Sequence, residues 1–336
     1  MIPHNRPSLG TEEEGAAIRV IQSGWLAQGN EVKAFEDELC RFLGLADGHA
    51  VAVSSGTAAL YLSLWALGAS GKRVALPSYV CAALRNAVAM ARATECLIDN
   101  ATESPNMDLK VIEHSGADLA IVPHTFGIPA AVAKLAARLP VIEDCAQSLG
   151  ASMDGVPTGL TGRLGVFSFY ATKLMTTGGQ GGAVVSKDKA LIDTIRDYRE
   201  FDCRKDSKLR FNFQMTDLQA AIGGAQLLKL PAFLKRRSEI YEFYKNSGLG
   251  LIDGTGNIQP VRYRAVLRTE SPRTVIEQLA ARGIKAIVPL EDWELLGERS
   301  RFPNAHALTQ CTVSLPAYPS LTDEELGSVV AGVLNR

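Results

Sequence analysis

The chain has 336 residues, of which 46% are hydrophobic and 21% charged, and its formal net charge is −1. A chain of this length and composition can bury a large core and suggests two domains. The near-neutral charge gives no electrostatic case for binding nucleic acid or an anionic membrane surface. We therefore expect a globular protein that binds neither.

The first fifteen residues, MIPHNRPSLGTEEEG, contain no apolar core segment and turn acidic early, unlike a signal peptide. No apolar run reaches the length that crosses a membrane. The six cysteines are scattered, without CxxC spacing or a histidine cluster beside them: Cys40, Cys81, Cys96, Cys145, Cys203 and Cys311. This distribution is typical of reduced thiols in a cytoplasmic protein and predicts no metal site.

From residue 50 onward, short apolar runs alternate with helical patterns. The runs AVAV, RVALP, CLI, LAIVP and PVIE read as strands, and helical segments lie between them. This alternation predicts an α/β fold with a mostly parallel central sheet covered by helices. GVFSFY and GGAVVS add two strands that are close enough in sequence to be neighbours.

A long helical region follows at about 216–245, and Pro231 is expected to kink or break it. Beyond it the pattern changes to VRYRAVLR, a helix near 273–282, IKAIVP, CTVSLP and a terminal helix. We predict a large domain at 1–230 and a smaller C-terminal α+β domain at 231–336.

The segment SSGTAAL, residues 54–60, joins a predicted strand to a predicted helix. Free backbone N–H groups at a helix start bind anions, and Gly56 lets the backbone approach a ligand closely. The hydroxyls of Ser55 and Thr57 can add donors. The alternative is a plain N-cap, which Ser and Thr supply routinely.

Three further residues have both a ligand-binding and a structural interpretation. Asp144 ends a predicted parallel strand, at the edge where such sheets bind ligands, and can bond a heterocyclic nitrogen or cap a helix. Tyr79 follows another strand and can stack on a flat ring or pack in the core. Asn212, just before the long helix, is a ligand contact or a turn residue.

Lys173 is the one charged residue between Leu164 and Ser186, where average composition would place about five charges. A lysine in apolar surroundings is costly unless it is paired or neutral, and its pKa then falls readily. Either its side chain reaches water, or the lysine is retained for chemistry.

One small molecule needs a phosphate cradle, a stacking aromatic, an acid for a ring nitrogen and a lysine that forms a Schiff base. That molecule is pyridoxal phosphate. A protein that only binds phosphate needs no such lysine. A nicotinamide-dependent oxidoreductase needs no Schiff base, and its glycine fingerprint is absent after the first strand.

An ordered series of motifs then resembles the DegT/DnrJ/EryC1/StrS aminotransferases, the sugar-aminotransferase branch of fold-type I pyridoxal-phosphate enzymes. The series runs nearly end to end: SGWLAQG, SSGTAAL, PSYV, EDCAQSLGA, FSFYATKLMTTGGQGG, NFQMTDLQAAIG and FPNAHAL…SLPAYPSLT. The order of the motifs is far more specific than any one of them.

By this resemblance Lys173 would be the Schiff-base lysine and the proton carrier. Asp144 would be the partner of the pyridinium nitrogen, and Tyr79 would stack on the ring. Gln147 would lie near the phenolic oxygen of the ring.

The resemblance also implies how the phosphate is held. Gly56, Thr57 and Ser168 would contact it, beside the Ser55 hydroxyl discussed above. Asn212 would reach the phosphate bound by the neighbouring subunit, so the functional unit would be a homodimer with shared active sites.

Three positions depart from the family pattern. Gln180 stands where the family usually has Glu, and Gln214 where it usually has a basic residue. The His-Tyr pair often found in the small domain is absent, and IKAIVPLEDW occupies that region. None of these is an implied cofactor contact, so the departures concern the substrate.

The resemblance implies an aminotransferase that moves an amino group from L-glutamate, or glutamine, to a keto carbon. The keto group would belong to a nucleotide-linked sugar of polysaccharide or secondary-metabolite biosynthesis. The cofactor would alternate between pyridoxal phosphate and pyridoxamine phosphate. Two alternatives are a sugar dehydratase, in which the family replaces the lysine by histidine, and a cofactor-binding sensor without turnover.

Overall fold

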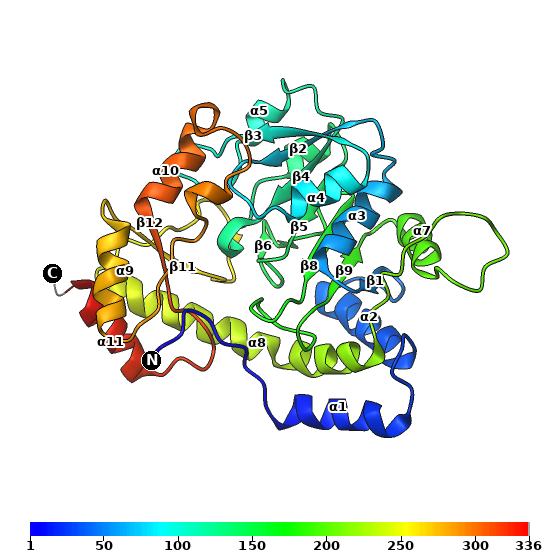
Figure 1. The fold of residues 1–336 in the computed structure, drawn as a ribbon, viewed down its shortest axis with the longest axis horizontal. Coiled ribbons are helices and arrows are strands. Elements are labelled where there is room, and N and C mark those ends of the chain that lie inside the picture. Colours follow the sequence, from blue (N-terminus) through cyan, green and yellow to red (C-terminus); the bar gives the residue numbers. More distant parts are fainter. Residues whose placement is uncertain (335–336) are drawn as a thin grey trace.

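The computed structural model describes residues 1–334 and has an α/β architecture built on a seven-stranded sheet (Figure 1). The strand order is β1-β9-β8-β5-β4-β2-β3. Only β9 runs antiparallel to its neighbours; the pairs β2–β3, β2–β4, β4–β5 and β5–β8 are parallel. The strands are β1 (Ala50–Val53), β2 (Arg73–Pro77), β3 (Thr94–Ile98), β4 (Leu119–Pro123), β5 (Val141–Asp144), β8 (Leu164–Ser168) and β9 (Gly182–Val185). The predicted mostly parallel sheet is confirmed, and so is the pairing of its last two strands.

Helices cover both faces of this sheet. Val51 and Val53 of β1 pack on one face with helices α3, α4 and α7, because alternate residues of a strand point to opposite faces. Ala50 and Ala52 pack on the other face with α2 and α8. The covering helices are α2 (Asn30–Leu43), α3 (Gly56–Ala66), α4 (Ala83–Met90), α5 (Leu109–Ile112), α6 (Ala133–Ala136) and α7 (Lys189–Arg199).

The C-terminal part forms a smaller α+β unit around an antiparallel pair of strands, as expected. β11 (Ala265–Arg268) pairs with β12 (Thr312–Leu315), and α9 (Pro272–Ala281) and α11 (Asp323–Leu334) share its core. Helix α10 (Pro303–Cys311) precedes β12. Three short strands form a separate sheet: β6 (Ser152–Met153), β7 (Val156–Pro157) and β10 (Ile258–Gln259). Single 3-10 turns are η1 (Thr125–Gly127), η2 (Asp292–Glu294) and η3 (Arg299–Arg301).

The first residues of the chain join this C-terminal unit. Ile2 forms a parallel bridge with Ile284 and exchanges backbone hydrogen bonds with Gly283 and Lys285. Helix α1 (Thr11–Ser23) then packs on the other side of the molecule, below α8 in Figure 1. The N-terminal strap, residues 1–8, therefore crosses between the two units.

Helix α8 (Asp217–Asn246) passes beneath both the large sheet and the C-terminal unit (Figure 1). It runs without interruption through Pro231, so of the two outcomes expected there a break is wrong, and a kink stays a prediction. A proline removes one backbone hydrogen bond and costs about 3 kcal/mol inside a helix. Buried Leu227, Leu230 and Phe233 flank it and hold the helix together. The boundary proposed at 230/231 lies inside this helix and stays a prediction.

Within residues 1–334, no helix is long and apolar enough to cross a membrane. The same residues contain no group of three or more His, Cys, Asp or Glu side chains arranged to hold a metal ion.

Candidate active site

The carboxyl edge of the large sheet gathers most of the predicted site residues. Asp144 is the last residue of β5 and lies opposite Val166 of the neighbouring β8, which ends at Ser168. Ser55 lies between β1 and α3, at the same edge. In parallel sheets this edge is where ligands bind.

The start of α3 forms a cradle with the end of β8. The Ser55 hydroxyl accepts the backbone N–H of Ala58 at 3.1 Å, so Ser55 is an N-cap. A Cβ on Gly56 would lie 2.8 Å from Cβ of Ser168, and therefore only glycine lets the two segments approach this closely. Thr57 is half-buried in the first turn. Free N–H groups, the helix dipole and three hydroxyls suit a phosphate here.

Asp144 is buried, with 7% of its surface exposed, and its Oδ1 accepts the backbone N–H of Ala146 at 3.0 Å. Among residues 1–334 the carboxylate has no second hydrogen-bond partner. Burial raises the pKa of Asp144, while the N–H of Ala146 and the charge of Lys173 act to lower it. A protonated ring nitrogen would supply the countercharge that this buried carboxylate lacks.

The preceding residue, Glu143, anchors the end of β5. Its Oε1 accepts the N–H groups of Thr161 and Gly162, and its Oε2 bonds Nε2 of His124 at 2.9 Å. Nδ1 of His124 accepts the N–H of Ala130, which leaves the imidazole proton on Nε2. Burial opposes ionisation, yet these hydrogen bonds hold the pKa of Glu143 below its usual value. The anchored strand end fixes the position of Asp144.

Lys173 lies in the loop between β8 and β9 and is half-buried. Its Nζ lies 5.4 Å from the centroid of the Tyr263 ring. No hydrogen bond or ion pair to its ammonium occurs among the described residues. The loop that carries Lys173 follows β8, the strand that pairs with β5, which ends at Asp144. Tyr263 is a neighbour that the sequence did not single out.

Gln147 is held by the backbone of η1. Its Oε1 accepts the N–H of Phe126 at 2.7 Å, which leaves the amide NH₂ as a donor. Phe126 has a φ of 61°, a conformation that is uncommon for a residue other than glycine. The segment at Gly127 also contacts the backbone of Gln147 and Tyr263 closely. Gln147 is therefore well placed to donate toward a ring oxygen at this edge.

Tyr79 is 3% exposed and packs edge-on against Phe126, at 6.2 Å between ring centroids. Its ring belongs to a cluster with Leu290 and Phe302, and within residues 1–334 its hydroxyl has no hydrogen-bond partner. This packing does not favour stacking on a cofactor, which stays a prediction. Desolvation and the charge of the Asp144 carboxylate raise the pKa of the Cys81 thiol. Sequence reasoning treated Cys81 as an ordinary thiol.

Asn212 is exposed, and its Oδ1 accepts the N–H of Gln214. The Gln214 side chain donates to Glu200, and Gln180 is exposed beside the lysine loop. The backbone oxygen of Phe213, the residue after Asn212, accepts the N–H of Ser54 at the start of the cradle. Asn212 is thus near the start of the cradle, its amide NH₂ has no partner among the described residues, and its role across subunits stays a prediction.

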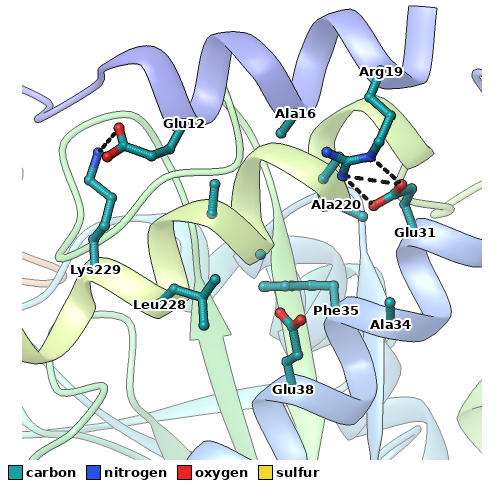
Figure 2. A pocket seen from close by; sticks show the side chains of 13 residues that line it. Glu12, Ala16, Arg19, Glu31, Ala34, Phe35, Glu38, Ala220, Leu228 and Lys229 are labelled. Carbon is teal, nitrogen blue, oxygen red and sulfur yellow. Dashed lines mark hydrogen bonds and ion pairs between the residues drawn. The ribbon is translucent and has the colours of Figure 1, made fainter. Parts of the chain in front are cut away.

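A separate cavity of about 320 Å³ lies between α1, α2 and α8 (Figure 2). Phe35 and Leu228 line it, and the ion pairs Glu12–Lys229 and Arg19–Glu31 border it. None of the predicted site residues lines this cavity. It belongs to the packing of α1 and is not the active site.

Pyridoxal phosphate requires a phosphate site, an acid for its ring nitrogen and a lysine, and this sheet edge supplies all three. The fold and the site thus define a pyridoxal-phosphate-dependent transferase. Within this class the chain belongs to the DegT/DnrJ/EryC1/StrS aminotransferase family, whose family model matches residues 7–334.

Curated relatives and solved structures match along the whole chain. The dTDP-4-dehydro-2,3,6-trideoxy-D-glucose 4-aminotransferase of Saccharopolyspora spinosa is 31% identical over 98% of this chain and 95% of its own length. The GDP-perosamine synthase of Escherichia coli O157:H7 is 29% identical over 97% and 95%. The crystal structure of the aminotransferase TlmJ from Streptoalloteichus hindustanus has a TM-score of 0.91 at 28% identity, covering 99% of this chain and 98% of that chain.

Proposed function

We propose that this protein transfers an amino group from L-glutamate, or glutamine, to the keto carbon of a nucleotide-linked sugar. The observation that carries the proposal is Lys173, an amine without an ionic partner among the described residues, in the loop after β8, the strand that pairs with the one ending at the buried Asp144. The names of the relatives support the acceptor class, since one is a synthase of a GDP-linked sugar and another a dTDP-sugar aminotransferase.

When bound, pyridoxal phosphate supplies an electron-withdrawing ring that accepts charge from the donor's α-carbon. Lys173 would hold the cofactor covalently through Nζ and, once released, would carry a proton as a neutral amine. Asp144 would keep the ring nitrogen protonated. Ser55, Gly56 and Thr57 would orient the phosphate, and Ser168 would add a fourth contact.

The functional unit is proposed to be a homodimer in the cytoplasm. The exposed amide of Asn212 beside the cradle supports a contact with a second subunit. All six cysteines are free, which suits a reducing compartment.

Borohydride reduction of the cofactor-loaded protein, followed by peptide mapping, tests the lysine. A modified Lys173 resists trypsin, so the adduct is expected on the peptide 164–187. An adduct on another lysine, or no adduct on loaded protein, would overturn the assignment.

Single-turnover reaction with L-glutamate tests the activity. The cofactor absorbance is expected to shift, with release of one 2-oxoglutarate per site. L-glutamine is the second donor to test. Cofactor binding without any amino-acid reaction would instead indicate a sensor, and loss of a sugar hydroxyl would indicate a dehydratase.

A further inference from the structure

The carbonyl group that precedes Lys173 is bonded by the N-terminal strap. Nδ2 of Asn5 donates to the backbone oxygen of Thr172 at 2.8 Å. Within residues 1–334, Asn5 supplies the one hydrogen bond to this oxygen. The two residues lie 167 positions apart in the sequence, so no local pattern predicts this bond.

The orientation of the Asn5 amide is set by its two partners. Its Oδ1 accepts the backbone N–H of Arg6 at 2.8 Å. An N–H needs the amide oxygen and a carbonyl needs the amide nitrogen, so a flipped amide would lose both bonds. Asn5 is also half-buried, which limits competition from water. Its Nδ2 is therefore committed to Thr172.

The peptide group between Thr172 and Lys173 is bonded on both sides. Its oxygen accepts from Asn5, and its N–H donates to the backbone oxygen of Tyr170 at 2.9 Å. Because a peptide group is planar, these two bonds fix the plane that carries Cα of Lys173. At the far end of the side chain, Nζ lies 5.4 Å from the centroid of the Tyr263 ring. The direction in which the lysine leaves the backbone is thus restricted.

The strap is tied on both sides of Asn5. Toward the C-terminal unit, Nε2 of His4 bonds the Ser314 hydroxyl at 2.9 Å, next to the backbone pairing of Ile2 described above. Toward α1, Nε2 of Gln226 donates to the backbone oxygen of Ser8 at 2.8 Å. The first residues of most domains are poorly ordered unless they are tied down. Here they form a fixed support for the side chain of Asn5.

Gln226 connects the same support to the other end of the lysine loop. It lies in α8 and is 2% exposed. Its Oε1 accepts the backbone N–H of Thr176 at 3.3 Å, while its Nε2 bonds Ser8 of the strap. The loop is therefore linked to the strap twice, directly at Thr172 and through Gln226 at Thr176.

We propose that Asn5 is a positioning residue for Lys173. Its hydrogen bond to Thr172 holds the lysine in the direction from which the amine bonds the cofactor. This inference rests on the proposed role of Lys173. Asn5 acts through the backbone and not on the reacting atoms. The phosphate cradle and Asp144 lie on other segments, so their contribution to cofactor binding does not depend on Asn5.

Two forms of the cofactor separate this role from a general loss of structure. Lys173 can bond the aldehyde carbon of pyridoxal phosphate, with loss of one water, whereas pyridoxamine phosphate has no aldehyde. Asn5→Leu keeps a branched side chain and removes the donor. It should weaken pyridoxal phosphate by roughly threefold to tenfold, as for one neutral hydrogen bond, and leave pyridoxamine phosphate unchanged. Equilibrium titration of the cofactor-free protein would measure both affinities.

Asn304→Leu is the matched control. Asn304 is also half-buried and donates to a backbone oxygen at 2.8 Å, but to that of Asn100, outside the lysine loop. The ratio of its two affinities should equal that of the unmodified protein. If Asn5→Leu does not fold, Asn5→Ala takes its place with the same expectation.

A loss for pyridoxamine phosphate as large as that for pyridoxal phosphate, or no loss for either, would overturn the inference. Lys173→Ala tests the proposed function separately, and it should weaken pyridoxal phosphate more than Asn5→Leu does. If Lys173→Ala binds both forms as the unmodified protein does, the proposed role of Lys173 fails, and the role of Asn5 fails with it.

Discussion

Asp144 is the residue whose chemistry depends most on its surroundings. It is buried and accepts one hydrogen bond, and the charge of Lys173 acts to lower its pKa. Neighbouring Glu143 is also buried but is satisfied by two backbone N–H groups and His124. Two adjacent carboxylates therefore differ in function: one is fully bonded and structural, and the other is available to a ligand.

Asp144→Asn should still bind the cofactor but slow the reaction with L-glutamate by about a hundredfold or more, because a fixed charge partner is lost. Stopped-flow absorbance would measure this rate. Asp154→Asn is the control, since Asp154 is exposed on a turn. A near-normal rate for Asp144→Asn would show that this carboxylate only caps the backbone.

Gly56→Ala should weaken cofactor binding, because the added Cβ would lie 2.8 Å from Cβ of Ser168. Equilibrium titration of the cofactor would detect the change. Gly15→Ala in α1 is the control, because a Cβ at this exposed position would have no atom within 4 Å. This variant should bind the cofactor normally and gain up to about 1 kcal/mol in helix stability. Equal cofactor affinity in the two variants would contradict the close approach.

At residue scale, the sequence predicts the position of the polar groups more readily than that of the aromatic ring. Asp144 ends a strand, and Ser55 and Gly56 come just after one, so the edge of a parallel sheet brings these three residues together. Tyr79 follows a strand too, but whether a ring there faces a ligand or the core depends on the C-terminal unit. Leu290 and Phe302 of that unit surround it. Such contacts between distant segments leave no local pattern.

At the scale of elements, a buried ion pair joins α2, α7 and β1. Arg199, the last residue of α7, bonds Glu36 of α2, and both are 5% exposed. Glu36 accepts the N–H of Ala52, and Arg199 donates to the carbonyl oxygen of the same residue. The pair therefore ties two helices to the edge strand that precedes the phosphate cradle.

Arg199→Met should lower the free energy of unfolding by about 3–5 kcal/mol, because it leaves the buried Glu36 charge with only the longer ion pair to Arg196 at 3.9 Å. Denaturant titration would measure the loss. The exposed pair Arg19–Glu31 is the control, and Glu31→Gln should cost less than about 1 kcal/mol. A similar small cost in both variants would show that water reaches Glu36.

The elements themselves were largely predictable, because strand and helix periods are local. The strands at 50–53, 73–77 and 119–123 begin and end at the same residues as the apolar runs AVAV, RVALP and LAIVP. The error at Pro231 has a physical cause, since tertiary packing along α8 outweighs the local cost of a proline. The antiparallel direction of β9 was not predicted, because only pairing in space sets it.

At the scale of the whole molecule, the proposal of a site shared between two subunits predicts complementation between them. Lys173→Ala lacks the reactive amine, and Asn212→Asp would repel the phosphate of the neighbouring subunit. Each variant alone should be nearly inactive. After subunit exchange about half the dimers are mixed, each with one intact site, so activity should return to roughly a quarter of the unmodified value.

Mass analysis of differently tagged chains must first demonstrate exchange. A mixture of Lys173→Ala with the double variant Lys173→Ala, Asn212→Asp is the control and should regain nothing. If the single variants exchange and activity stays absent, Asn212 acts within its own chain.

The N-terminal strap gives the molecule a defined order of assembly. Ile2 pairs with Gly283 and Lys285, and His4 bonds Ser314. Translation reaches these partners long after it has made the strap. At about 5–20 residues per second, the strap waits about 15–60 s for them. The large sheet, whose last strand ends at Val185, can form during this time, whereas the strap can dock only after residues 283–314 have been made. A nascent chain can therefore form the sheet edge with its proposed cofactor cradle well before the strap joins the C-terminal unit.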